Sequence, residues 1–153
     1  MTLVEILITA SIIGLLAAFI MPAYTMAVKY RENALVASRL RQAAAAFGLY
    51  RMEVGALPAT RTDGTVPPGM DDYFVSLGIK SWWTQPTPVG GVWGWSAEGT
   101  PAVMLYNVTR PASQMLDVDK MVEPVESDRI GSLSAGSFCK TRSGESYSYS
   151  IGQ

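Results

Sequence analysis

The residue whose chemistry stands out is Glu5, an acid at the start of an apolar stretch. No charged side chain follows it from Ile6 to Val28, a run of 23 residues. An ionised carboxylate at the centre of such a segment costs about 2.5–3.5 kcal/mol to insert into a membrane. The nearest cation in the sequence is the α-amino group of Met1, because the first basic side chain is Lys29. The spacing therefore predicts an ion pair between a carboxylate and an amine.

The apolar run behind Glu5 must position this carboxylate. As a helix with a rise of about 1.5 Å per residue it would span roughly 34 Å, enough to cross a hydrocarbon core of about 30 Å. Within one helix, Met1 and Glu5 lie about one turn apart and could pair locally, and the helix dipole already favours an acid there. Between neighbouring chains, the same pair would fix a stagger, because each helix would slide until its carboxylate met another chain's amine.

A family resemblance is carried by the first 24 residues, M-T-L-V-E-I-L-I-T-A-S-I-I-G-L-L-A-A-F-I-M-P-A-Y. They resemble the processed amino terminus of a type IV pilin or a type II secretion pseudopilin, and the resemblance extends to about residue 50. It implies cleavage by a prepilin peptidase, N-methylation of Met1, and pairing of Glu5 with a neighbour's amine during assembly. It also implies that Gly14 and Pro22 are helix breakers that bound a stretch which unwinds in filaments. We expect the chain to be the mature form, although Met1 departs from the usual phenylalanine.

A plain membrane tether is the alternative for this segment. A cleaved signal peptide fits poorly, because the apolar run is long and no basic region precedes it. Lys29, Arg31, Arg39 and Arg41 follow the run, which by itself would place the carboxyl side in the cytoplasm. The resemblance implies the reverse orientation, in the bacterial inner membrane before assembly and in an extracellular or periplasmic filament afterwards.

Composition excludes several function classes. The net charge is −1 without a basic tract, so a nucleic-acid surface has no support. Without histidine, the usual Ser-His-Asp and Cys-His arrangements and His-based metal sites are excluded, and we expect no enzyme. Cys139 is the only cysteine, so no intramolecular disulfide can form, and we expect it to be a small buried residue. Many type IV pilins carry a carboxyl-terminal disulfide, whereas major pseudopilins commonly lack it, which favours the pseudopilins.

The helix is predicted to continue past the apolar run. An apolar stripe recurs at helical spacing and predicts packing against a sheet; its members are Val36, Leu40, Ala43, Phe47, Tyr50 and Val54. The opposite face is predicted to be basic, with Arg31, Arg39, Arg41 and Arg51. Gly55 and Pro58 should end the helix.

The predicted fold class is therefore α+β and pilin-like: a long amino-terminal helix, apolar in its first half, packed on a small antiparallel sheet. We expect a transmembrane or filament-core helix over 1–28, its amphipathic continuation over 29–54, and a globular head over 55–153. Within the head the patterns predict a loop over 56–72, a short helix or extended segment over 73–79, strands over 92–96 and 102–109, a helix over 111–123, and a hairpin of 138–142 with 146–151.

Two sharper site hypotheses have plainer alternatives. The four tryptophans, Trp82, Trp83, Trp93 and Trp95, could form a sugar-binding platform, but aromatic residues near strands usually fill a core. The carboxylates of Asp117, Asp119, Glu123, Glu126 and Asp128 could bind Ca²⁺, as the resembled pseudopilins do. Their spacing does not match an EF-hand, and a solvated helix face explains most of them. We therefore expect no cofactor and no metal.

These features predict a structural subunit of a type IV pilin-like filament, a homopolymer built on staggered amino-terminal helices. The resemblance implies an assembly platform and an ATPase as partners, and a role in adhesion, motility or DNA uptake. The first alternative is a pseudopilin of a type II secretion system that drives protein export. The second alternative is a membrane-tethered periplasmic binding domain or enzyme.

Overall fold

The computed structural model describes residues 2–122, 138–141 and 146–151. The chain divides into two compact units, a first unit of Met1–Glu32 and a second unit of Asn33–Gln153. Both contain part of the helix α1, which runs from Leu3 to Val54 without interruption. The order of the remaining elements is α2, α3, β1, β2, α4, β3 and β4.

The first unit consists of the amino-terminal part of α1. Gly14 and Pro22 both lie inside the helix and neither interrupts it in this single chain. Pro22 has no backbone N–H to donate, and the hydroxyl of Thr25 donates to the Pro22 carbonyl at 2.9 Å. Residues 2–27 are all exposed. By length and composition this helix suits a membrane span.

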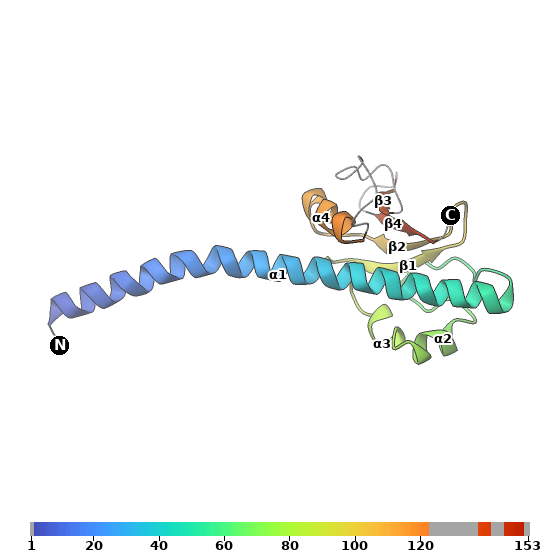
Figure 1. Ribbon diagram of the computed structural model, residues 1–153, viewed down its shortest axis with the longest axis horizontal. Helices are drawn as coiled ribbons and strands as arrows, with labels where there is room; N and C mark the ends of the chain where they lie inside the picture. The colour runs from blue at the N-terminus through green and yellow to red at the C-terminus, as the bar shows by residue number, and fades with distance from the viewer. Residues whose placement is uncertain (1, 123–137, 142–145, 152–153) are drawn as a thin grey trace. The chain divides into compact units, whose positions relative to one another are not determined.

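The second unit is built on a four-stranded antiparallel sheet in the order β1-β2-β4-β3 (Figure 1). The strands are β1 (Val92–Ser96), β2 (Ala102–Tyr106), β3 (Phe138–Lys140) and β4 (Tyr147–Ser150). Trp93 lies opposite Leu105, and Leu105 opposite Tyr147, so that these side chains share one face of the sheet. The predicted α+β class, with a long helix on a small antiparallel sheet, is confirmed.

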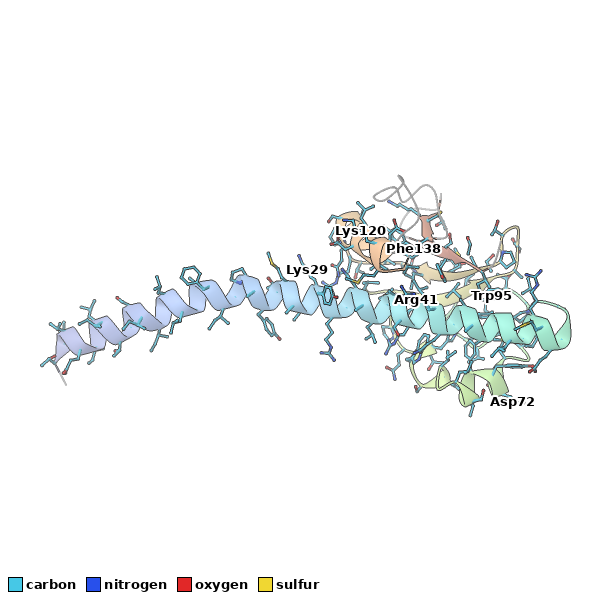
Figure 2. The ribbon with its side chains drawn as sticks, in the orientation of Figure 1. Lys29, Arg41, Asp72, Trp95, Lys120 and Phe138 are labelled. Carbon is cyan, nitrogen blue, oxygen red and sulfur yellow. The ribbon has the colours of Figure 1, made fainter. Side chains whose placement is uncertain are left out.

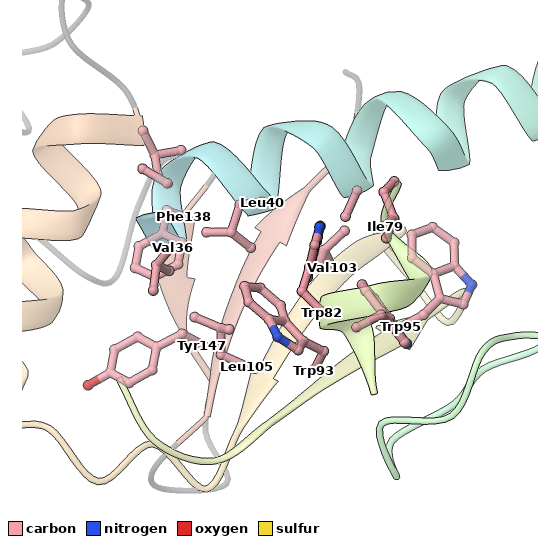
Figure 3. Packing of buried hydrophobic residues seen from close by; sticks show 14 of the residues in the cluster. Val36, Leu40, Ile79, Trp82, Trp93, Trp95, Val103, Leu105, Phe138 and Tyr147 are labelled. Atoms are coloured by element: carbon pink, nitrogen blue, oxygen red, sulfur yellow. The ribbon is translucent and has the colours of Figure 1, made fainter. Parts of the chain in front are cut away.

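The part of α1 that belongs to the second unit packs its predicted apolar stripe against this sheet (Figure 3). Val36, Leu40, Ala43 and Phe47 are completely buried, and Tyr50 is partly buried against the same core. The prediction was wrong for Val54, which is 52% exposed. The helix ends there, because Gly55 adopts a φ of 75° and closes the last turn onto the Arg51 carbonyl. The final turn therefore extends past the core.

Aromatic side chains fill the centre of the second unit. The Phe47 ring stacks on Trp95 with a centroid distance of 3.9 Å and meets Phe74 edge-on at 5.8 Å. All four tryptophans are buried, which confirms the core interpretation and leaves no exposed platform for a sugar. Phe74 comes from α2 (Asp71–Ser76), and Trp82 from the short helix α3 (Lys80–Trp83), which the sequence did not predict.

The loop between α1 and α2 is fixed to this core. The indole N–H of Trp95 donates to the Pro58 carbonyl at 3.0 Å, and that of Trp83 donates to the Thr65 carbonyl at 3.1 Å. Arg61 also forms a two-way backbone bridge with Trp95 at the free edge of β1. A segment whose composition predicts a loop is therefore held at several points.

The remaining helix, α4 (Ala112–Val122), lies within one residue of its predicted limits. It contacts α1 through a buried hydrogen bond of 2.9 Å from the Gln114 amide to the Asn33 side-chain oxygen. At its other end, the Arg41 guanidinium donates to the carbonyls of Met121 and Val122. α4 is thus attached to α1 near both of its ends.

Two local predictions about the strands need correction. β2 ends at Tyr106 instead of Thr109, because Asn107 turns the chain with a φ of 55°, a conformation that asparagine tolerates better than most residues. Cys139 is only half-buried. It alternates with the buried Phe138 on the edge strand β3, so its side chain lies on the opposite face of the sheet.

Candidate assembly surface on the long helix

Glu5 takes part in a reciprocal cap at the start of α1. The backbone N–H of Thr2 donates to a Glu5 carboxylate oxygen at 2.6 Å, and the Glu5 N–H donates to the Thr2 hydroxyl at 3.4 Å. This pair of bonds is a capping box, which satisfies two backbone donors at a helix amino terminus. The spacing Thr2-x-x-Glu5 is the sequence signature of this cap. It gives Glu5 a local structural role.

The cap does not neutralise the charge of Glu5. The side chain is exposed, and both of its cap partners are the uncharged groups of Thr2. Among the described residues, no ion pair involves Glu5. Met1 lies outside the described residues, so the pairing of its amine with Glu5, and its N-methylation, stay predictions.

The first unit presents apolar side chains on every side of the helix. Phe19, Met21 and Met26 are about as exposed as Leu3 at the helix start, each at 70% or more. A soluble surface helix normally buries one apolar stripe and exposes a polar face. A helix that is apolar all round is stable only when lipid or protein surrounds it. By length and composition the first unit suits such surroundings.

The second unit has an uncharged strip on the side of α1 that faces solvent. We call it the outer face; its exposed members are Ala34, Leu35, Ser38, Gln42, Ala45, Leu49 and Met52. Leu35, Leu49 and Met52 are 38%, 40% and 76% exposed. From Leu35 onward the spacings alternate between three and four residues, as in a seam that contacts another helix.

The predicted basic face was wrong for Arg39, and Arg41, although exposed, binds a neighbouring helix. Arg41 is turned towards α4, where it binds the Met121 and Val122 carbonyls (Figure 2). Arg39 is half-buried, with its guanidinium carbon 5.1 Å from the centroid of the Trp82 ring. Helical periodicity predicts on which side of α1 each arginine lies. It does not predict that α3 and α4 flank the helix at these positions. Their capture of these two side chains leaves the outer face without charge between Ala34 and Met52.

The acidic residues suggested for calcium are not assembled in the described chain. Asp117 forms an ion pair with Lys120 at 3.4 Å on the exposed side of α4, and Asp119 is buried on the same helix. Glu123, Glu126 and Asp128 lie outside the described residues. Within residues 2–122, 138–141 and 146–151, no group of three or more potential metal ligands occurs.

Comparisons with protein-family models, with curated proteins and with solved structures find no match to this chain. A functional interpretation must therefore start from its own surfaces. Three of these are notable: an apolar first unit, an exposed Glu5 carboxylate at its start, and an uncharged outer face on the second unit. All three lie on α1, and all three lack a partner of matching chemistry among the described residues.

Proposed function

We propose that this chain is a structural subunit of a type IV pilin-like filament. The observation that carries the proposal is the outer face, an exposed helix surface of Ala, Leu, Ser, Gln and Met without charge. A surface helix in a monomer carries charged and polar residues on that side. Small and apolar residues there suit close contact with the helix of another subunit.

Burial of this face would contribute to assembly. Complete burial of a leucine or methionine side chain is worth about 1.5–3 kcal/mol. Leu49 and Met52 are 40% and 76% exposed, so a second helix on the outer face would remove much of this apolar surface from water. The polar members, Ser38 and Gln42, could hydrogen-bond across the contact, and Ala34 and Ala45 allow close approach.

The first unit supplies the other half of the proposed subunit contact. Before assembly its apolar surface would lie in the bacterial inner membrane, and in the filament it would lie among equivalent helices from other copies. Glu5 would then pair with the N-methylated amine of Met1 in a neighbouring copy. A prepilin peptidase would generate that amine, and an assembly platform with its ATPase would extract the subunit. The expected loss of helix between Gly14 and Pro22 belongs to this assembled state.

A charge placed at the centre of the outer face tests the proposal. Ala45 is exposed, so Ala45→Glu should leave the second unit folded while it prevents helix contact, and filament yield should fall at least tenfold. Ala59→Glu is the matched control, because Ala59 is also exposed but lies in the loop after α1. Filaments are counted by electron microscopy of sheared material from cells that make the protein. A wild-type yield from Ala45→Glu would remove the outer face from the assembly contact.

A second candidate is a pseudopilin of a type II secretion system, favoured by the single cysteine, Cys139. Such a subunit would form a short periplasmic filament that drives protein export. Cell fractionation separates the two candidates: a surface pilus is released by shearing of intact cells, whereas a pseudopilus is released only after the outer membrane is opened. Secretion of exported proteins would fail in a deletion strain only in the second case.

A further inference from the structure

Arg39 differs from the other basic residues of the second unit in its surroundings. It lies on α1 beside the outer face, and its guanidinium carbon is 5.1 Å from the centroid of the Trp82 ring. The Trp82 ring belongs to α3 and is buried in the core (Figure 3). Burial also lowers the pKa of Arg39, which means that the protein has removed part of the water that stabilises its charge.

No acid of the described chain compensates for this loss of water. Lys80 pairs with Asp71 at 2.9 Å and Lys120 with Asp117 at 3.4 Å, while Arg41 binds backbone carbonyls at the end of α4. Within the described ranges, Arg39 has neither an ion pair nor a side-chain hydrogen bond; its contact is the indole of Trp82. A guanidinium has five N–H donors in a planar fork, so most of its hydrogen-bonding capacity is open to an incoming group.

We propose that Arg39, supported by Trp82, is a binding site for a carboxylate of a second copy of this chain. The inference rests on the proposed function and adds a specific contact to it. A planar guanidinium matches a carboxylate through two parallel hydrogen bonds, a geometry that lysine cannot reproduce. The Trp82 ring limits the side chain to few orientations, so less entropy is lost when the partner binds.

Charge complementarity identifies a second copy as the source of the carboxylate. Residues 54–153 contain ten acidic and seven basic side chains, whereas residues 29–53 contain two acidic and five basic ones. Asp72 on α2 and Glu98 after β1 are exposed, and neither forms an ion pair within the described part of the chain. Arg39 also borders the outer face, where the proposed function places a neighbouring subunit. Asp63 and Glu53 are also exposed and without an ion pair, but their carboxylates already accept hydrogen bonds from Thr65 and Tyr73. We therefore expect the acid that binds Arg39 to be Asp72 or Glu98 of that neighbour.

Neutral and charge-conserving variants of the full-length chain test the site. Arg39→Gln should reduce filament yield at least tenfold. Arg39→Lys should reduce the yield less, because lysine keeps the positive charge but lacks the planar fork of N–H donors. Arg51→Gln is the matched control, since Arg51 is an exposed arginine on the same helix that forms no ion pair within the described residues. Thermal unfolding of each variant shows whether a loss of filaments is caused by a loss of folded protein. We expect the filament yield of Arg39→Gln to fall by more than its content of folded protein. A wild-type yield from Arg39→Gln overturns the proposal.

A charge exchange identifies the partner. Arg39→Glu should prevent assembly, and either Asp72→Arg or Glu98→Arg in the same chain should restore it. Rescue by one of them supports the proposal, and absence of rescue by both overturns it. This outcome is distinct from failure of the proposed function. If the wild-type chain forms no filaments, the filament assignment fails. If wild-type filaments form, Ala45→Glu prevents them and the Arg39 variants behave as wild type, the carboxylate site alone fails.

Discussion

Replacement of Glu5 by glutamine separates the two roles that its carboxylate can have. The structure gives Glu5 a local role, because it accepts a 2.6 Å hydrogen bond from the Thr2 N–H. Glutamine fills the same position of a capping box, so Glu5→Gln keeps the cap and removes the charge. Glu5→Ala removes both. A comparison of the two variants therefore measures what the charge contributes to assembly.

The two contributions differ in size. Loss of a cap partner costs about 0.5–2 kcal/mol of helix stability. A carboxylate and an ammonium 4 Å apart attract each other by about 1 kcal/mol in water and about 4 kcal/mol at an effective dielectric constant of 20. The second figure applies to a filament core from which water is excluded. Since each 1.4 kcal/mol is a factor of ten, loss of the charge should lower incorporation by about fivefold to a thousandfold.

The assay is filament yield in sheared material, set against the amount of subunit in the membrane fraction. We expect both Glu5→Gln and Glu5→Ala to enter the membrane as well as wild type, because each makes the segment less polar, and both to assemble poorly. If Glu5→Gln assembles normally while Glu5→Ala does not, Glu5 serves only as a helix cap. Normal assembly of both variants would mean that neither role contributes to the filament.

Three further predictions concern the second unit. Phe47→Ala should destabilise it by about 3–5 kcal/mol, because Phe47 is fully buried among aromatic rings; a urea midpoint within error of wild type would contradict this. Gly91→Ala should also be strongly destabilising, since Gly91 has a φ of 80° and a Cβ there would lie 2.0 Å from the Tyr106 carbonyl oxygen, and an unchanged midpoint would disprove that clash. The Glu53 carboxylate accepts a hydrogen bond from the Tyr73 hydroxyl, which raises the pKa of Tyr73, so Glu53→Gln should lower that pKa in a tyrosinate absorbance titration. The stabilisation from this bond is present below the usual tyrosine pKa of about 10 and is lost as the pH rises through the raised value; an identical titration curve in the variant would contradict the assignment.

Local sequence signals predict most of the second unit because its elements are long enough to show a period or are bounded by turn residues. β1 occupies the five residues expected after the glycine pair Gly90-Gly91. α4 begins directly after Pro111, a residue that suits the first turn of a helix. The stripe from Val36 to Phe47 is buried, as its spacing predicts. In each of these cases the sequence pattern lies within or next to the element that it predicts, so no contact with a distant segment is needed to recognise it.

Features that depend on distant segments could not be predicted. α3 has only four residues, too few to show a helical period, and it supplies the Trp82 ring beneath Arg39. The position of Arg39 on α1 follows from 3.6 residues per turn, but its burial depends on a segment more than forty residues away. The same holds for Arg41 and α4. The site beside the outer face therefore becomes visible only when these long-range contacts are known.

The boundary between the two units gives a last prediction. Sequence places the end of the apolar run at Val28, and the second unit begins at Asn33, whose side chain is buried and accepts a hydrogen bond from Gln114. A fragment that begins at Lys29 retains this bond, and we expect it to be a folded, soluble monomer, because the apolar first unit is absent.

A fragment that begins at Ala34 lacks Asn33 and should be less stable by about 1–3 kcal/mol, the cost of removing one partner of a buried hydrogen bond. Asn33→Ala in the longer fragment is the matched control, since it removes the same acceptor without shortening the helix. Urea denaturation followed by near-UV circular dichroism measures all three. Equal urea midpoints would show that the bond between Gln114 and Asn33 contributes nothing to stability. A molten longer fragment would show that the second unit does not fold without the rest of α1. Folding of the longer fragment as a monomer, the expected result, would show that the outer face and Arg39 do not suffice for self-association without the first unit, where Glu5 lies.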